Sequence, residues 1–291
     1  MKKIILFAIS VLFLMSSCTK HKLIFDMTPV ETNSAEIQIH YMEPVTDGAA
    51  NYVDSVYIND VLVSSANGSG SLATYNGVPG GAVGRFFVAN VGSNNIKFMR
   101  KGAVIYNQDV TLTAGKQNVI VHNLNQAPIV IDNEFPYWNR TAPATGAGWN
   151  TDSVIKVMFI NLLYENATTP YPGTIQYQYQ RVGNILDKIT GAVIGTEPDT
   201  WFNMGSPVAF GESTGRVEIV VHKQTFNSSG NQRLNYRILD ENGNVLKVWN
   251  GSKLVNYSDY WNGYIGRVYM HFFSGVRTAN PKPSVRQWTS L

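Results

Sequence analysis

Apolar and polar residues alternate with a period of two along much of this chain. In Ser34 to Met42, every second residue from Ala35 to Tyr41 is apolar, and polar side chains stand between them. This alternation predicts a β-strand with one buried face. Segments of the same kind recur at 53–58, 61–64, 85–91, 96–100, 103–106, 109–112, 117–122 and 129–132, and then at 152–163, 174–182, 216–222, 231–239, 245–249 and 263–273. The sequence therefore predicts an all-β protein.

Turns rich in Gly, Asn and Pro separate these segments about every 8–12 residues, which is typical of antiparallel β-sandwiches. Residues 133–150 break the pattern with an aromatic stretch followed by Thr, Ala, Pro and Gly. We therefore predict two tandem β-sandwich domains, at 34–132 and 151–291, joined by a linker at 133–150. Residues 96–112 and 234–254 show a similar order of strands and turns, which indicates diverged copies. Residues 184–194 fit either a helical turn or a loop.

The amino terminus has the pattern of a secretory signal. Lys2 and Lys3 precede an apolar run from Ile4 to Met15, and two serines stand before Cys18. The run is shorter than the ~20 residues that a membrane-spanning helix needs. Cys18 is the only cysteine in the chain, so no internal disulfide is available to it. Its setting resembles the lipobox of bacterial lipoproteins, which implies a signal peptide at 1–17, cleavage before Cys18 and lipid on that cysteine.

A lipidated cysteine would hold the chain to a membrane, because two or more acyl chains bind firmly where one binds marginally. Residues 18–33 then form the lipidated start and a polar tether. Thr19 replaces the Asp that often retains lipoproteins at the inner membrane, which favours the outer membrane. The basic residues Lys20, His21 and Lys22 leave the periplasmic and extracellular faces equally open.

Charge and histidine spacing exclude several classes of partner and cofactor. Removing residues 1–17 takes away two lysines, which lowers the formal net charge from +3 to +1. This balance gives no basic surface for a nucleic acid, so we expect none as a partner. The histidines are widely spaced and no second cysteine accompanies them, so we expect no metal and no other cofactor.

One part of the sequence is similar to a known group of domains. The residues that carry the similarity are 35–40, 53–59, 75–78 and 112–116. Together they resemble an uncharacterised immunoglobulin-like domain family of Bacteroidota lipoproteins, over about residues 34–132 and more weakly over 152–275. The resemblance implies two tandem immunoglobulin-like antiparallel β-sandwiches and a cell-envelope setting. It implies no catalytic residues.

The sequence offers little to a catalytic mechanism. It has no Gly-x-Ser-x-Gly elbow for a nucleophilic serine. Glycoside hydrolysis needs two carboxylates that flank one bond. The candidates in loops are Glu197, Asp199 and Glu212, and the sequence does not show which two of them would lie together. Residues 240–244 read as a β-turn rather than a calcium loop. We therefore predict a protein that is not an enzyme, with a hydrolase as the least favoured hypothesis.

Aromatic residues outside the predicted strands are the candidate ligand-binding groups, because exposed rings offer flat faces for sugar rings and often mark recognition sites. These candidates are Tyr137, Trp138, Trp201, Tyr260 and Trp261. The more frequent role for such residues is to fill an inter-domain interface or to cap a sandwich. The leading hypothesis is a non-catalytic envelope protein that recognises a glycan or another protein. The alternative is a structural subunit of a surface assembly.

Two short motifs predict a modification. Asp54-Ser55-Val56 and Asp152-Ser153-Val154 resemble the Asp-Ser/Thr-aliphatic acceptor of protein O-glycosylation in Bacteroidota. They make Ser55 and Ser153 candidate glycosylation sites. A three-residue pattern often arises by chance, so the plain alternative is two unmodified strand serines.

Overall fold

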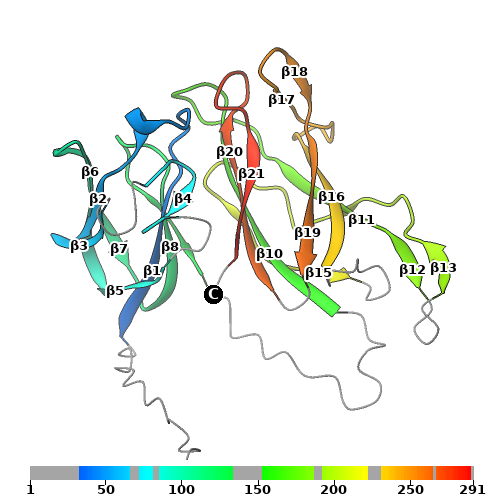
Figure 1. Cartoon of the computed structure of the whole chain (residues 1–291), viewed down its shortest axis with the longest axis horizontal. Helices are drawn as coiled ribbons and strands as arrows, with labels where there is room; N and C mark the ends of the chain where they lie inside the picture. The colour runs from blue at the N-terminus through cyan, green and yellow to red at the C-terminus, as the bar shows by residue number, and fades with distance from the viewer. Residues whose placement is uncertain are drawn as a thin grey trace, which may run out of the picture. The chain divides into compact units, whose positions relative to one another are not determined.

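The computed structural model describes residues 33–65, 72–80, 85–133, 153–186, 192–221, 231–264 and 267–289, and it confirms the predicted all-β fold (Figure 1). These residues contain one 3-10 turn, η1 (Ala49–Asn51), and no α-helix. Among them, no helix has the length and apolar character to cross a membrane. The predicted signal peptide, Cys18 and nearly all of the predicted linker lie outside the described residues.

The first half of the chain forms two sheets that share a core. The β1 sheet has the order β4–β1–β8–β9, and β5 also pairs with β1. Its strands are β1 (Ser34–Tyr41), β4 (Asn76–Gly77), β5 (Phe87–Asn90), β8 (Gly115–Val121) and β9 (Ile129–Asp132). The β2 sheet has the order β3–β2–β6–β7. Its strands are β2 (Ser55–Ile58), β3 (Val61–Ser65), β6 (Gly92–Arg100) and β7 (Ala103–Leu112).

The second half forms two sheets and two hairpins. The β10 sheet, in the order β15–β10–β20–β21, consists of β10 (Ser153–Tyr164), β15 (Ser213–Val221), β20 (Val268–Val276) and β21 (Ser284–Thr289). The β11 sheet, in the order β14–β11–β16–β19, consists of β11 (Gln176–Val182), β14 (Phe202–Asn203), β16 (Asn231–Leu239) and β19 (Ser258–Tyr264). The hairpins join β12 (Asn184–Leu186) to β13 (Val193–Thr196) and β17 (Lys247–Trp249) to β18 (Leu254–Asn256). The segment that fitted a helical turn or a loop thus contains strand residues.

The two halves repeat one strand order. In each half the first long strand pairs in parallel with a late strand, β1 with β8 and β10 with β20. In each half that late strand then pairs antiparallel with the next one, β9 or β21. This shared order supports the predicted duplication. The sequence comparison of 96–112 with 234–254 was wrong in one respect, because it made the strand at 245–249 the counterpart of β7. In the structure β7 pairs with β6, and the corresponding partner of β16 is β19. Among the described strands, β17 and β18 pair only with each other.

Three clusters of buried side chains hold the described residues together. One lies between the β1 and β2 sheets and includes Ile37, Phe98 and Val119. The second lies between the β10 and β11 sheets and includes Phe159 and Tyr236. Apolar residues on alternate strand positions supply both clusters, as the period-two pattern requires.

The third cluster draws on both halves of the chain. It joins the β10 sheet to the side of the β1 sheet that faces away from the β2 sheet. Its members are Met42, Tyr75, Ile120, Met158, Ile160, Leu162, Met270, Phe272 and Trp288. Residues 32–291 accordingly form one compact unit. The β10 sheet therefore packs against other strands on both faces, which explains why residues 158–163 are apolar at every position except Asn161.

Candidate functional site

The structure describes three of the five candidate aromatic residues, and they differ in exposure. Tyr260 is 51% exposed, and Trp201 is half-buried. Trp261 is only 6% exposed, because it points into the second sandwich, where its ring lies 4.7 Å from that of His271. Tyr137 and Trp138 lie outside the described residues. Of the three described aromatics, Tyr260 and Trp201 therefore have ring surface that a ligand could reach.

Tyr260 and Trp201 both lie on the outer face of the β11 sheet. Strand β16 creates this face by alternation, because Leu234, Tyr236 and Ile238 point into the core. Arg233, Asn235 and Arg237 then point outward, since successive side chains of a strand alternate. We call the outer set the polar face, which consists of Gln178, Gln180, Trp201, Asn203, Arg233, Asn235, Arg237 and Tyr260.

Cross-strand pairing brings these side chains into rows. Gln178 lies between Asn203 on β14 and Arg237 on β16. Asn235 lies between Gln180 on β11 and Tyr260 on β19. Residues that face each other across strands are close enough to interact. The polar face therefore forms two adjacent rows across the sheet.

Hydrogen bonds connect each row. Arg237 Nε donates to Gln178 Oε1 at 2.8 Å, and Gln178 Nε2 donates to Asn203 Oδ1 at 2.7 Å. In the second row, Arg233 Nε and Asn235 Nδ2 each donate at 3.2 Å, to Asn235 Oδ1 and to Gln180 Oε1. Connected networks hold side chains in fixed orientations, which prepares the face for a ligand.

Each arginine of the polar face also lies over an aromatic ring. The Arg233 guanidinium is 3.9 Å from the centre of the Tyr260 ring. The Arg237 guanidinium is 4.3 Å from the centre of the Trp201 ring. Such cation–π contacts orient both partners. The polar face thus combines two rings, two guanidinium groups and four side-chain amides.

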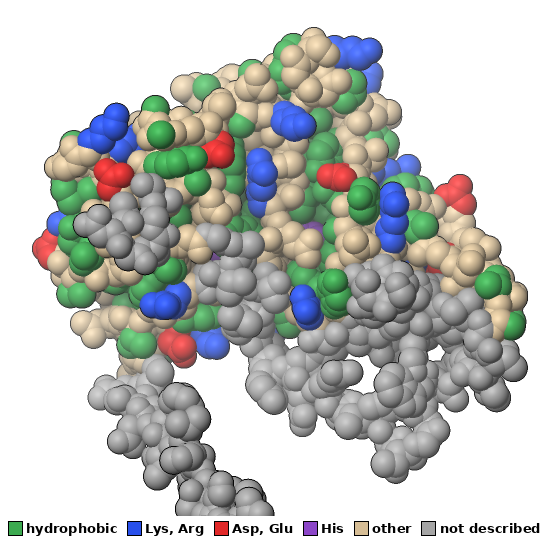
Figure 2. Space-filling view, viewed as in Figure 1, with side chains coloured by type: hydrophobic (Ala, Val, Ile, Leu, Met, Phe, Trp, Pro, Cys, Tyr) green, Lys and Arg blue, Asp and Glu red, His purple; other side chains and the backbone are tan. Residues whose placement is uncertain are grey.

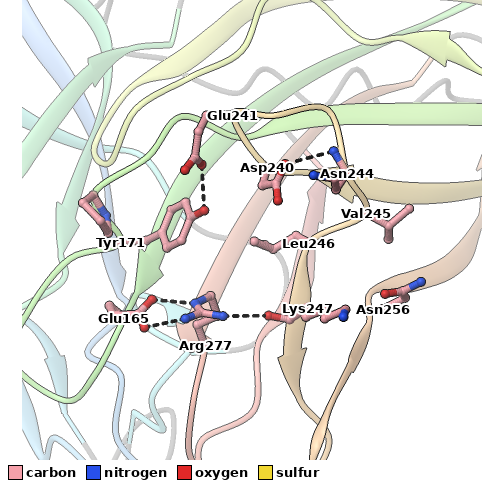
Figure 3. A pocket seen from close by; sticks show the side chains of 11 residues that line it. Glu165, Tyr171, Asp240, Glu241, Asn244, Val245, Leu246, Lys247, Asn256 and Arg277 are labelled. Carbon is pink, nitrogen blue, oxygen red and sulfur yellow. Dashed lines mark hydrogen bonds and ion pairs between the residues drawn. The ribbon is translucent and has the colours of Figure 1, made fainter.

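The cavity in Figure 3 is a second feature of the same half, and its carboxylates and its arginine already have partners. It measures about 850 Å³ and lies beside the turn that follows β16. Arg277 donates to both oxygens of Glu165 at 2.5 Å, and Tyr171 donates to Glu241 Oε2 at 2.8 Å. Burial, followed by the bond to Glu241, raises the pKa of Tyr171. The pairs satisfy one another, so the cavity favours a structural role.

The turn in this cavity agrees with the sequence prediction. Asp240 Oδ1 accepts hydrogen bonds from the backbone nitrogens of Asn242 at 3.0 Å and Asn244 at 2.9 Å. A carboxylate that bonds to the backbone two residues ahead is typical of a turn. Among the described residues, no group of three His, Cys, Asp or Glu side chains could hold a metal ion.

The three carboxylates considered for hydrolysis have separate structural contacts. Glu197 pairs with Arg181 at 3.3 Å, and its side chain is 2% exposed. Asp199 accepts a hydrogen bond from Gln180 at the edge of the polar face. Glu212 accepts one from the backbone nitrogen of Ala209 at 3.1 Å. None of these contacts joins two of the three carboxylates.

The candidate modification sites occupy different settings. Ser55 is half-buried in β2, which pairs with both β3 and β6. The preceding Asp54 accepts a hydrogen bond from the Lys101 backbone nitrogen at 2.5 Å. Ser153 begins β10 opposite Val221. Glycosylation of either serine stays a prediction.

Comparisons with known proteins find several solved structures with distant similarity to this chain. No family model matches the chain, and no curated protein matches it. A putative cell adhesion protein from Bacteroides fragilis NCTC 9343 aligns with 88% of this chain and 97% of its own, at 9% identity and a TM-score of 0.29. A putative cell adhesion protein from Bacteroides ovatus ATCC 8483 aligns with 88% and 98%, at 13% identity and a TM-score of 0.22. At such scores the fold assignment rests on the strand order and cores described above.

Proposed function

We propose that this chain is a non-catalytic binding protein of the bacterial cell envelope and that its polar face receives a glycan. In this proposal, lipid on Cys18 tethers the chain to the outer membrane, as the lipobox-like amino terminus implies. The observation that carries the binding role is the pairing of Tyr260 and Trp201 with Arg233 and Arg237 on one sheet face.

The chemistry of that face suits a carbohydrate. A sugar ring presents an apolar side of C–H groups and an edge of hydroxyl groups. Exposed rings such as Tyr260 can cover the apolar side, whereas the amides of Gln178 and Asn235 can bond to hydroxyl groups. A sheet face built from β-strands also holds these groups more rigidly than loops would.

The proposal is tested by measuring glycan binding of the Tyr260→Ala and Trp201→Ala variants on an array, followed by titration of any hit. We expect each variant to lose roughly tenfold in affinity, which corresponds to about 1.4 kcal/mol. The loss follows from removal of one stacking surface. Circular dichroism should show unchanged folding, because both positions lie on the outer face.

Tyr57→Ala is the matched control. Tyr57 is a half-buried tyrosine on β2, and its ring also lies near a cation, 4.9 Å from Lys97 Nζ. It belongs to the β2 sheet, away from the polar face, so its removal should leave glycan affinity unchanged. Equal losses for Tyr57→Ala and Tyr260→Ala would contradict the proposal.

A structural subunit of a surface assembly is the second candidate, and one observation favours it. The edge strand β3 exposes Val61 to 65% and Leu62 to 50%. Exposed apolar residues on an edge strand are suited to pairing with another chain. A stoichiometric envelope partner that is lost in the Leu62→Lys variant, together with no glycan binding, would select this function.

A further inference from the structure

The hydrogen bonds of the polar face use its acceptors more fully than its donors. Gln178 Oε1, Gln180 Oε1 and Asn235 Oδ1 each already accept a bond within the face. In contrast, Arg233 and Arg237 each donate only their Nε–H within it. A guanidinium has five N–H donors, so four donors of each arginine make no hydrogen bond in the described part of the chain.

The face also has more positive than negative charge. No carboxylate among the described residues forms an ion pair with Arg233 or Arg237, which contact neutral amides and aromatic rings instead. Asp199 is the carboxylate that joins the network, through its bond from Gln180. Two guanidinium groups therefore stand against one carboxylate.

This local excess differs from the chain as a whole. The formal net charge is only +3, and it falls to +1 without residues 1–17. In the view of Figure 2, basic and acidic side chains are interspersed rather than gathered by sign. General attraction of the whole protein for polyanions should therefore be weak, and selectivity for an anion must come from a local site.

We propose that the polar face selects acidic glycans, whose carboxylate or sulfate groups bind Arg233 and Arg237. This inference rests on the proposed glycan-binding function and names the ligand class. Arginine suits this task, because its planar fork matches two oxygens of a carboxylate or sulfate. The two arginines are four residues apart on β16, about 13 Å along the strand, so an extended acidic chain can reach both while a single sugar reaches one.

The test compares charged and uncharged forms of the same polysaccharide on the full-length protein. Polygalacturonate is compared with its methyl ester for carboxylates, and dextran sulfate is compared with dextran for sulfates. We expect the preferred anionic polymer to bind at least on the order of tenfold more tightly than its uncharged form, with affinity falling as salt rises. The pair with the larger difference identifies the anionic group.

Variants then locate the effect. Arg233→Gln and Arg237→Gln remove the charge but keep a side-chain amide, and each should weaken anionic binding on the order of tenfold. Lys253→Gln is the matched control, because Lys253 is an exposed cation of the same half that lies before β18, outside the polar face. It should leave the affinity unchanged, and thermal melting should show that all three variants fold.

The outcomes separate this inference from the function on which it rests. Binding of neutral and anionic polymers with equal affinity, lost in Tyr260→Ala, would overturn the selectivity and keep the glycan site. Equal weakening by Lys253→Gln and Arg237→Gln would also overturn it, because binding would then follow total charge. Absence of Tyr260-dependent binding to every polymer would overturn the proposed function itself.

Discussion

The outer faces of the two sheets in the second sandwich have opposite chemistry. On the β10 sheet the outward side chains include Ile160, Met270 and Phe272, and all of them are buried against the first half of the chain. On the β11 sheet the outward side chains include Gln178 and Arg237, and they are half-buried or exposed. Both sheets contribute to the same core on their inner faces.

This contrast separates packing from recognition. An apolar outer face is stable only when something covers it, and the β1 sheet supplies that cover for the β10 sheet. A face of amides, guanidinium groups and rings is stable in water, and its arginines keep unused N–H donors for a partner from outside. The β11 sheet is therefore the sheet of the second sandwich on which we place the ligand.

The largest expected effect comes from removing a side chain from the outer face of the β10 sheet, which the β1 sheet covers and which we call the covered face. Phe272 is fully buried, and its ring lies 5.0 Å from that of His40 and 6.5 Å from that of Trp288. Phe272→Ala should lower the free energy of unfolding by about 3–5 kcal/mol, because it leaves a cavity between the two halves. Urea unfolding followed by circular dichroism measures this change. A loss below about 1 kcal/mol would mean that the covered face contributes little to stability.

A smaller effect is expected from acid. His40 lies on β1, against Phe272 of the β10 sheet, with its Nε2 3.2 Å from Asn118 Oδ1, and His271 lies in the core of the second sandwich. Burial lowers the pKa of His40 to about 4 and that of His271 to about 3. Below the unfolded pKa of 6.5, the unfolded chain binds these protons more readily, so stability falls as pH falls from 6.5 toward the folded pKa.

The size of the acid effect follows from the pKa difference. Each histidine should cost up to about 2 kcal/mol of stability at pH 5 relative to pH 7. Glu43 changes stability in the opposite direction. Burial raises its pKa, so the folded chain binds this proton more readily and stability rises as pH falls. The variant His40→Gln isolates one histidine, since it should reduce the drop in unfolding free energy between pH 7 and pH 5. An unchanged drop in this variant would show that His40 does not titrate on unfolding.

Much of the fold was predictable because strand periodicity is local. The segments 129–132 and 231–239 have the same bounds in the sequence prediction as strands β9 and β16. The contrast between the two outer faces was also visible, since residues 158–163 are apolar at nearly every position while residues 176–180 alternate. Burial on one or both faces therefore leaves a direct trace in the sequence.

The candidate site was only partly predictable, because it depends on pairing between distant strands. The sequence singled out Tyr260 and Trp261 but did not predict the strand that contains them, β19. Neighbouring residues on a strand point to opposite sides, so one of the two had to be buried. Pairing of Leu234 with Trp261 and of Asn235 with Tyr260 decides which one. Likewise, the aromatic partners of Arg233 and Arg237, which are Tyr260 and Trp201, lie far from them in the sequence.

The smallest expected effect concerns stability at the polar face. Tyr260→Ala removes a ring that is 51% exposed and whose described cation–π partner is Arg233. We expect it to lower the free energy of unfolding by at most about 1 kcal/mol, since exposed cation–π contacts contribute little. The same urea measurement as for Phe272→Ala allows a direct comparison of two aromatic-to-alanine changes on adjacent sheets. A loss as large as that of Phe272→Ala would mean that the polar face is a packing surface, and the contrast between the two faces would no longer identify the binding site.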